Sequence, residues 1–234
     1  MADIDWADIE WDENGTPMSA RFQDPYYSRT DGQAETRHVF LAGNGLPGRW
    51  QDERWLDTAS FTIAELGFGT GLNFLETLAH WQQLLPNGQL NYVAFEKFPM
   101  PQADLARALA RWQGLAEQAA QLIARWPPEA GWSAMEFDGA LLHIAIGDAN
   151  DHLETWNGKA NAWYLDGFSP AQNPDMWGSN LMQAVAGHTQ PGGTFATFTV
   201  AGWVRRNLQA AGFEVEKMPG FGRKRECLRG RLPR

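Results

Sequence analysis

From residue 61 onward, two kinds of apolar pattern alternate along the chain. Short apolar runs, typical of buried strands, are followed by longer segments whose apolar residues recur every three or four positions, as on one helix face. The predicted strands are Phe61–Leu66, Leu90–Phe95, Leu141–Ile146, Ala162–Leu165, Thr194–Thr199, Phe213–Val215 and Glu226–Leu228. The predicted helices are Leu72–Leu85, Gln102–Arg125, Met176–His188 and Trp203–Ala210. This alternation predicts an α/β fold with a doubly wound, mostly parallel sheet and helices on both faces.

The N-terminal part of the chain has a different character. Turn-forming pairs such as Asn14-Gly15 and Asp31-Gly32 interrupt it, and Gly43-Asn44-Gly45 follows. These residues favour loops and tight turns, so we expect an irregular segment with a hairpin at most. The predicted organisation is an N-terminal extension, residues 1–58, packed on a catalytic domain of residues 59–234.

Composition narrows the classes of protein. The chain has no apolar run near the roughly 20 residues that cross a bilayer, and its acidic start lacks the pattern of a signal peptide. A single cysteine, Cys227, excludes an internal disulfide, and the five histidines lack the spacing of metal ligands. We therefore expect a cytoplasmic protein without a structural metal.

Charge is unevenly distributed along the chain. The net charge is −9, yet residues 201–234 contain nine basic and three acidic residues. A basic segment on an acidic body can form a local face for phosphate groups. A solvated tail is the alternative.

A glycine-rich turn, Gly67–Gly71, separates the first predicted strand from the first predicted helix. Glycines at alternate positions let the backbone pass close to a ligand. The dinucleotide fingerprint spaces its glycines as G-x-G-x-x-G, whereas here the third glycine comes one residue early and Glu65 precedes the turn. A carboxylate at this place repels a pyrophosphate and suits the ammonium of an amino-acid moiety. The pattern thus favours S-adenosylmethionine over NAD, with a purely structural turn as the alternative.

Two further acids follow predicted strands, where open α/β sheets bind their ligands. Glu96 ends the second strand and is placed to accept hydrogen bonds from ribose hydroxyls, which supports a nucleoside without choosing between cofactors. Asp148 follows the third strand and can accept from the amino group of adenine. It can equally be the N-cap of the next helix.

Asp166 ends the fourth strand, within a segment that continues through Phe168 and Pro170 to Trp177. This arrangement resembles the Asp-Pro-Pro-aromatic signature of amino-group methyltransferases. An amine that attacks a sulfonium methyl group needs a free lone pair in line with the bond that breaks, and Asp166 can hold its N–H groups in that orientation. Phe168 and Trp177 are candidates to stack a base, although aromatic residues beside a strand are more often part of the core.

Together these motifs resemble the methyltransferase domain of the bacterial MnmC family, the tRNA 5-methylaminomethyl-2-thiouridine biosynthesis proteins. The resemblance covers nearly the whole chain. Its carriers are Trp11–Pro17, Arg21–Ser28, Glu35–Leu41 with Gly43-Asn44, Glu65–Phe74, Tyr164–Trp177, Gly192–Thr199 and Gly220–Leu228.

The resemblance implies a class I S-adenosylmethionine-dependent methyltransferase that methylates the aminomethyl group on C5 of a wobble (2-thio)uridine in tRNA. The catalytic candidates are Asp166, which falls on a position of the family, and Phe168. The cofactor-binding residues expected from the motifs and the resemblance are Tyr26, Asn44, Glu65, Gly67, Phe68, Gly69, Thr70, Gly71, Asn73, Glu96, Lys97, Asp148, Ala149 and Asp166. The candidate tRNA contacts are Trp177, Arg205, Arg206, Arg223, Lys224 and Arg225.

One departure from the family pattern stands out. Bifunctional members continue into an FAD-dependent oxidoreductase domain, whereas this sequence has no second glycine-rich dinucleotide turn, so we expect neither FAD nor an oxidative step. Three other hypotheses stay open at this point: a methyltransferase of small-molecule amines, an NAD-dependent oxidoreductase, and a non-catalytic subunit that binds the cofactor.

Overall fold

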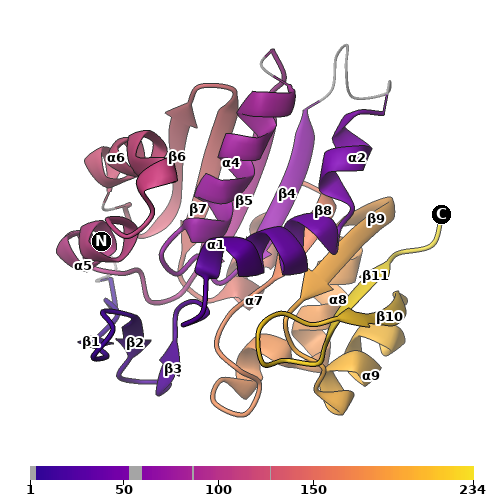
Figure 1. The fold of residues 1–234 in the computed structure, drawn as a ribbon. Coiled ribbons are helices and arrows are strands. Elements are labelled where there is room, and N and C mark those ends of the chain that lie inside the picture. Colours follow the sequence, from indigo (N-terminus) through magenta and orange to yellow (C-terminus); the bar gives the residue numbers. More distant parts are fainter. Residues whose placement is uncertain (1–3, 53–59, 86, 127) are drawn as a thin grey trace.

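A central eight-stranded sheet organises the protein, seen in a computed structural model that describes residues 4–52, 60–85, 87–126 and 128–234 (Figure 1). The predicted domain boundary after residue 58 lies outside the described residues. The strands are β4 (Phe61–Leu66), β5 (Leu90–Glu96), β6 (Gly131–Phe137), β7 (Ala140–Ile146), β8 (Ala160–Leu165), β9 (Thr189–Thr197), β10 (Glu214–Pro219) and β11 (Glu226–Arg231).

The sheet has the spatial order β10-β11-β9-β8-β4-β5-β7-β6. Strand β4 pairs in parallel with β5 and β8, β5 pairs in parallel with β7, and β8 with β9. Strands β6 and β11 run antiparallel to their neighbours. The mostly parallel, doubly wound sheet is therefore confirmed. After β4 the chain forms β5 on one side of β4, and it later forms β8 on the other side of β4. This reversal of the strand order creates a crevice at the carboxyl ends of these strands.

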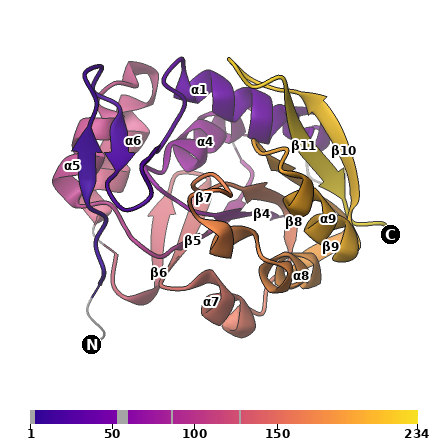
Figure 2. The ribbon, with the colours of Figure 1, turned by 90° about the horizontal axis from the view of Figure 1, so that it is seen from below.

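Helices cover both faces of the sheet, as the alternation predicts. One face carries α1 (Gly32–Glu35), which continues into the π-helix η1 (Thr36–Ala42), and α2 (Leu46–Trp50), α4 (Leu72–Leu84), α5 (Gln102–Leu109), η2 (Gln113–Leu115) and α6 (Ala116–Arg125). The other face carries α7 (Ala149–Thr155), α8 (Ser179–Gly187) and α9 (Gly202–Ala210), with η3 (Pro174–Trp177) preceding α8. Figure 2 shows α1 and α4 on one side of the sheet and α7 and α8 on the other. Within the described residues, no helix is long and apolar enough to span a membrane.

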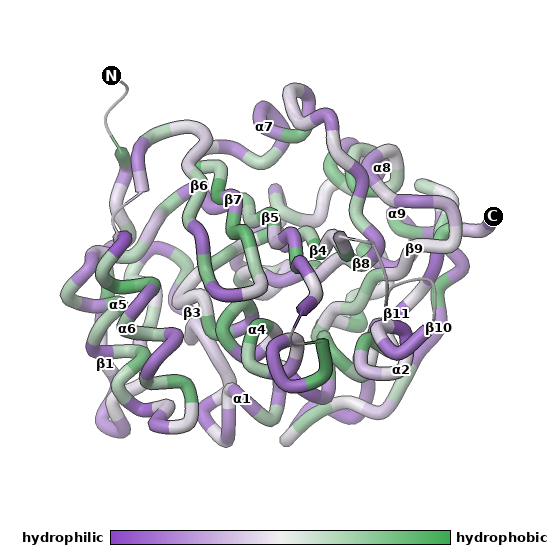
Figure 3. The backbone as a smooth tube through the Cα atoms, turned by 90° about the horizontal axis from the view of Figure 1, so that it is seen from above, coloured by the Kyte–Doolittle hydropathy of each residue, from purple (hydrophilic) through white to green (hydrophobic). Residues whose placement is uncertain are grey.

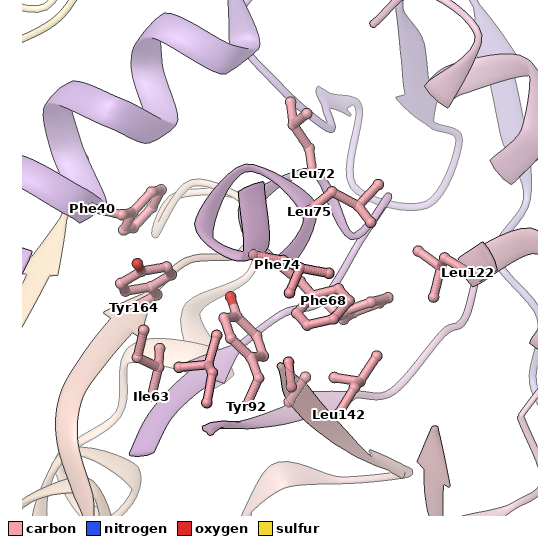
Figure 4. Packing of buried hydrophobic residues seen from close by; sticks show 14 of the residues in the cluster. Phe40, Ile63, Phe68, Leu72, Phe74, Leu75, Tyr92, Leu122, Leu142 and Tyr164 are labelled. Atoms are coloured by element: carbon pink, nitrogen blue, oxygen red, sulfur yellow. The ribbon is translucent and has the colours of Figure 1, made fainter. Parts of the chain in front are cut away.

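Side chains of β4 point alternately to the two faces of the sheet. Phe61 and Ile63 pack in the core on the α4 side, and Leu66 packs in the core on the opposite side. The same period of two directs Glu65 toward α4. Figure 4 shows the hydroxyl groups of Tyr92 and Tyr164 pointing toward this helix, so polar groups lie between the sheet and α4.

The segment Gln102–Arg125 is not one helix, contrary to the prediction. Helix α5 ends at Leu109 and α6 begins at Ala116. Gly114, with its low helix propensity, lies in the break, and Trp112 turns inward to pack edge-on against Tyr27 at 5.4 Å between ring centroids. Figure 3 shows both hydrophobic and hydrophilic residues along each of these two helices.

The N-terminal segment is more regular than predicted. It contains the expected hairpin, a small sheet of β1 (Ile9–Trp11), β2 (Pro17–Ser19) and β3 (Asp24–Pro25), but also the continuous helix α1–η1 and α2. The intrinsic helix propensity of the α1–η1 segment is low, because it contains Gly32, Thr36 and Val39. Burial of Val39, Phe40 and Leu41 against the domain stabilises it instead.

Candidate functional site

A cavity of about 920 Å3 opens at the carboxyl ends of β4, β5, β7 and β8. Residues that end or directly follow these four strands line it, namely Gly67, Glu96, Gly147 and Asp166. The segment from β2 to α1 and the β10–β11 loop complete its walls, and Figure 2 shows β1–β2 and β10–β11 on opposite sides of this edge. The volume is in the range of sites for cofactors and small ligands.

The glycine turn requires glycine for conformational and steric reasons. Gly67, Gly69 and Gly71 have φ angles of 81°, 55° and 72°, which side chains rarely adopt. A Cβ atom at Gly67 would lie 3.1 Å from the Cα of Gly167, and one at Gly71 would lie 2.8 Å from Cζ of Phe68. Because the turn has no Cβ atoms at these positions, its backbone borders the cavity closely.

Glu96 presents a carboxylate to the cavity from the end of β5. Its Oε2 accepts a hydrogen bond from the Gly69 N–H at 2.8 Å, and its Oε1 accepts one from the Phe98 N–H at 2.8 Å. Burial raises the pKa of Glu96, while these backbone N–H groups oppose the rise. Each oxygen keeps a lone pair, so a vicinal pair of hydroxyl groups matches this acceptor.

Asp148 combines the two roles that the sequence left open. Its Oδ1 accepts from the Asn150 N–H at 3.0 Å, which makes it the N-cap of α7, and its side chain also lines the cavity. Its Oδ2 accepts from Nζ of Lys97 at 2.8 Å. Desolvation works against ionisation, but the bonds from Lys97 and Asn150 prevail and lower the pKa of Asp148.

Asp166 is held at both carboxylate oxygens. The Nδ2 of Asn73, in the first turn of α4, donates to Oδ2 at 2.8 Å, and the Gly167 N–H donates to Oδ1 at 2.8 Å. The hydroxyl of Thr36 donates to Oδ1 of Asn73 at 2.6 Å, which fixes the orientation of this amide. Burial raises the pKa of Asp166 to about 7, although the bonds from Gly167 and Asn73 lower it. A carboxyl group with such a pKa can both accept and release a proton near neutral pH.

Glu65 acts through Asn73 rather than in the cavity. It is fully buried, and its oxygens accept from Nδ2 of Asn73 at 2.7 Å and from the hydroxyl of Tyr92 at 2.9 Å. Burial, with a contribution from the charge of Asp166, raises the pKa of Glu65. Because side chains alternate along β4, Glu65 lies under α4 and outside the cavity lining. In this structure its carboxyl group has no exposed surface for the direct contact with an ammonium group that the sequence predicted.

Aromatic side chains of the N-terminal segment meet the cavity floor. The ring of Tyr26 lies over the glycine turn, 3.3 Å from where a Cβ of Gly69 would be. Phe168 contacts Tyr26 edge-on at 5.1 Å and stacks on Phe22 at 4.7 Å between ring centroids. Burial, and next the charge of Glu96, raise the pKa of Tyr26, so its hydroxyl stays neutral.

Five basic side chains line the cavity and are exposed at its rim. They are Arg21, Arg29, Lys97, Arg223 and Lys224. Four of them form ion pairs, with Asp5, Asp12, Asp148 and Glu35 respectively, at N–O distances between 2.8 and 3.3 Å. Arg223 has no ion-pair partner among the described residues. Among the described residues, Arg223 therefore carries the uncompensated positive charge of the rim, whereas Glu96 and Asp166 place carboxyl groups at the floor.

Most of the residues proposed from the sequence come together at this cavity. Those that line it are Tyr26, Gly67, Phe68, Gly69, Thr70, Asn73, Glu96, Lys97, Asp148, Ala149, Asp166, Phe168, Arg223 and Lys224. Gly71 lies just behind the lining as the N-cap of α4. Arg205 and Arg206 lie on α9 and Arg225 lies in the β10–β11 loop, all outside the lining, so their contacts with RNA stay predictions.

Two proposed residues are structural in this arrangement. Trp177 has 1% of its surface exposed and donates its indole N–H to the Phe168 carbonyl at 3.0 Å, so no base can stack on its ring. Asn44 is buried and bonded to the carbonyls of Phe40 and Trp163, at 3.0 and 3.2 Å, away from the cavity lining. Trp177 thus matches the alternative of a core aromatic residue, and Asn44 lies outside the cavity lining, so the contact of Asn44 with the cofactor that the resemblance implies stays a prediction.

Sequence reasoning missed the contribution of the N-terminal segment and of two C-terminal aromatic residues. The missed lining residues include Arg21, Phe22, Ser28, Arg29, Glu35, Thr36, Phe198 and Phe221. They are far from the glycine turn in sequence and carry no local motif. The segments Arg21–Ser28 and Glu35–Leu41 are part of the family resemblance and indicated that this region matters, but they did not predict a role for any of these side chains. Within the described part of the chain, no group of three or more His, Cys, Asp or Glu residues is suited to hold a metal ion.

Comparison with a family model shows the family to which the chain belongs. The model, described as S-adenosyl-L-methionine-dependent methyltransferase, matches residues 113–233. MNMC2 from Aquifex aeolicus, a solved structure, has the same fold, with a TM-score of 0.76 at 23% identity over 97% of this chain and 72% of that one.

Curated relatives extend the match to nearly the whole chain. The "tRNA 5-methylaminomethyl-2-thiouridine biosynthesis bifunctional protein MnmC" of Marinobacter nauticus is 48% identical over 97% of this chain and 37% of its own length. The protein of the same name from Caulobacter vibrioides is 47% identical over 96% of this chain and 38% of its own length. The chain thus spans little more than a third of the length of these relatives.

Proposed function

Because this chain belongs to the family of S-adenosyl-L-methionine-dependent methyltransferases, we propose that it methylates the 5-aminomethyl nitrogen of a wobble (2-thio)uridine in tRNA. The product is 5-methylaminomethyl(-2-thio)uridine. The cofactor is S-adenosylmethionine and not a nicotinamide, and the relatives confirm the resemblance to the methyltransferase part of MnmC. Their printed name supports tRNA as the acceptor.

The cavity fits the cofactor of this family. Glu96 is suited to hold the ribose hydroxyls, Asp148 to accept from the adenine amino group, and the glycine turn to approach the amino-acid moiety without side chains in the way. S-adenosylmethionine, when bound, supplies a methyl group activated by a sulfonium. Tyr26 and Phe168 place two aromatic rings in contact with each other beside this floor.

Asp166 is the single observation on which the proposed acceptor rests. It ends β8 in the lining of the same cavity, and its protein donors leave lone pairs on both oxygens free for an incoming N–H. An alkylamine is mostly protonated in water, so it must lose a proton before it can attack. With a pKa of about 7, Asp166 accepts that proton and keeps the remaining N–H groups oriented.

The basic residues at the rim support a nucleic-acid acceptor. A chain with a net charge of −9 is repelled by RNA in general, but Arg223 places positive charge without an ion-pair partner among the described residues at the mouth of the cavity. Arg21 and Arg29 are further guanidinium groups at this rim, each in an ion pair with an aspartate. Phosphate contacts there orient the anticodon loop without reading its bases. A small-molecule amine needs no such rim.

Two measurements test this function. Calorimetry should show binding of S-adenosylmethionine, and mass spectrometry of 5-aminomethyluridine-containing tRNA after incubation with protein and cofactor should show a gain of one methyl group. Asp166→Ala should abolish transfer while largely sparing cofactor binding, and Arg223→Ala should lower the salt dependence of tRNA binding. If the protein methylates free amines and shows no salt-sensitive binding of RNA, the acceptor is a small-molecule amine and not tRNA. Cofactor binding without transfer to either acceptor would contradict the enzymatic proposal.

A further inference from the structure

The ammonium group of Lys224 occupies a defined place in the cavity. Its Nζ lies 3.3 Å from Oε1 of Glu35 and 4.1 Å from the centroid of the Phe198 ring. All three side chains line the cavity that Asp166 also lines. A carboxylate beside an aromatic face is a typical binding place for an organic cation.

Glu35 is held in place independently of Lys224. It lies at the end of α1, and its Oε2 accepts from the Ser28 N–H at 3.1 Å. Its side chain is 15% exposed, whereas that of Lys224 is 47% exposed. Within the described residues, Ser28 and Lys224 are its hydrogen-bond partners, so departure of Lys224 would leave a largely buried carboxylate oxygen facing the cavity without a donor.

The loop that carries Lys224 is tightly built. The Gly220 N–H donates to the Arg225 carbonyl at 3.0 Å, and a Cβ atom at Gly220 would lie 2.3 Å from the Lys224 carbonyl oxygen. These contacts bring the two ends of the loop close together, and the four-carbon side chain of Lys224 can reach several positions from it.

Lysine ends in a primary alkylammonium group, which is also what a protonated aminomethyl group presents. We propose that Glu35 and Phe198 form the subsite for the aminomethyl ammonium of the acceptor, and that Lys224 occupies this subsite until the acceptor displaces it. This inference rests on the proposed function and adds a residue that recognises the modification state of the RNA. The ion pair between Glu35 and the acceptor ammonium replaces the ion pair between Glu35 and Lys224, so the largely buried carboxylate of Glu35 keeps a cationic partner throughout.

Displacement gives Lys224 a second partner. Once its ammonium leaves Glu35, it lies exposed beside Arg223, which has no ion-pair partner among the described residues, at the same rim. An RNA phosphate is the complementary anion. The charges of this pair also act on Asp166. After burial and its hydrogen bonds, Glu35 raises and Lys224 lowers the pKa of Asp166. An aminomethyl ammonium at Glu35 thereby enters the cavity that Asp166, the proposed proton acceptor, also lines.

Two anticodon stem-loop RNAs that differ only in the wobble base, 5-aminomethyluridine or uridine, test the subsite. Their dissociation constants are measured by fluorescence anisotropy with the intact protein saturated with S-adenosylhomocysteine. We expect the wild-type protein to prefer the aminomethyl RNA about tenfold or more, the effect of one charge-assisted hydrogen bond. Glu35→Gln should remove this preference, and the uridine RNA should bind the variant at least as tightly as the wild-type protein, because the substitution also frees Lys224 for an RNA phosphate.

Matched variants separate recognition from folding and from general charge. Glu216→Gln removes the same charge from an exposed carboxylate that pairs with Arg229 outside the cavity lining, and should keep the preference. Lys224→Met should keep or increase the preference, because it frees Glu35, and should lower the salt slope for the aminomethyl RNA, which displaces Lys224 toward a phosphate, by about one. Unchanged S-adenosylhomocysteine affinity shows that each variant is folded.

Methyl transfer to the aminomethyl RNA is measured alongside. Absence of transfer by the wild-type protein would refute the proposed function. Transfer with equal affinity for the two RNAs, or with the full preference retained in Glu35→Gln, would refute the subsite alone.

Discussion

Replacing Asp166 by asparagine should stabilise the folded protein at alkaline pH and destabilise it at acidic pH. Burial raises the pKa of Asp166 from 3.8 to about 7. Between these values the folded protein keeps a proton that the unfolded chain has released. The free energy of unfolding of the wild-type protein therefore falls as pH rises from about 4 to about 7, and the full penalty persists above that range. Asparagine does not titrate, so the variant lacks this penalty.

The size of the effect follows from the shift. About three pKa units at 1.36 kcal/mol each give a penalty of about 4 kcal/mol above pH 7, and integration gives a difference of about 3 kcal/mol between pH 5 and pH 8.5. Asparagine offers one oxygen where Asp166 offers two, so it loses the donor from either Asn73 or Gly167. That loss costs about 1–3 kcal/mol at every pH, so the variant is less stable near pH 4 and more stable at pH 8.5.

The assay is urea denaturation followed by circular dichroism at pH 5 and pH 8.5, without cofactor. Asp138→Asn is the matched control, because Asp138 is exposed and outside the cavity lining. Its effect should be small at both pH values. A stability difference between wild type and Asp166→Asn that is the same at both pH values, or that grows toward acid, would refute the reasoning about the buried carboxyl group.

Three other outcomes are expected. Asn73→Ala removes the donor to Oδ2 of Asp166, so the pKa of Asp166 should rise further and the midpoint of the pH–rate profile for methylation should move to higher pH; an unmoved midpoint contradicts the positioning role. Glu96→Gln should weaken S-adenosylmethionine binding about tenfold by calorimetry, and an unchanged affinity would remove Glu96 from the cofactor site. Gly71→Ala should lower the free energy of unfolding by about 2–4 kcal/mol, because it combines a left-handed φ with a Cβ 2.8 Å from Phe68. Gly48→Ala, with nothing within 4 Å of its Cβ, is the control, and a cost as large as that of Gly71→Ala would falsify the steric account.

The architecture and the edge that carries the site could be predicted from the sequence. Strands and helices differ in apolar period, and parallel strands direct their carboxyl ends to one edge of the sheet. Those two local facts are enough to anticipate that Glu96, Asp148 and Asp166 lie at one cavity. The glycine turn was readable for the same reason, since positive φ angles at Gly67, Gly69 and Gly71 depend on residue type and hardly on distant neighbours.

Other predictions failed where packing overrides local preference. The N-terminal helix α1–η1 has poor intrinsic propensity and is stabilised by burial of Phe40 and its neighbours against the domain. The long predicted helix Gln102–Arg125 breaks because Trp112 gains more from the core than a continuous helix offers.

By itself, the sequence determined the alternation of strands and helices from β4 onward, the glycine turn and the acids at the ends of the strands, because each depends on residues that are near neighbours in the chain. The antiparallel strand β6, the N-terminal helices and the break between α5 and α6 were not predicted. Only the tertiary structure decided what these groups touch. It placed Glu65 beneath Asn73 instead of in the cavity, because strand alternation directs its side chain toward α4. It also joined Glu35 to Lys224, 189 residues apart, because the N-terminal helix and the β10–β11 loop meet over the same edge of the sheet. A contact at that separation leaves no periodic trace in the sequence, since it arises from how whole elements pack and not from the spacing of residues within one.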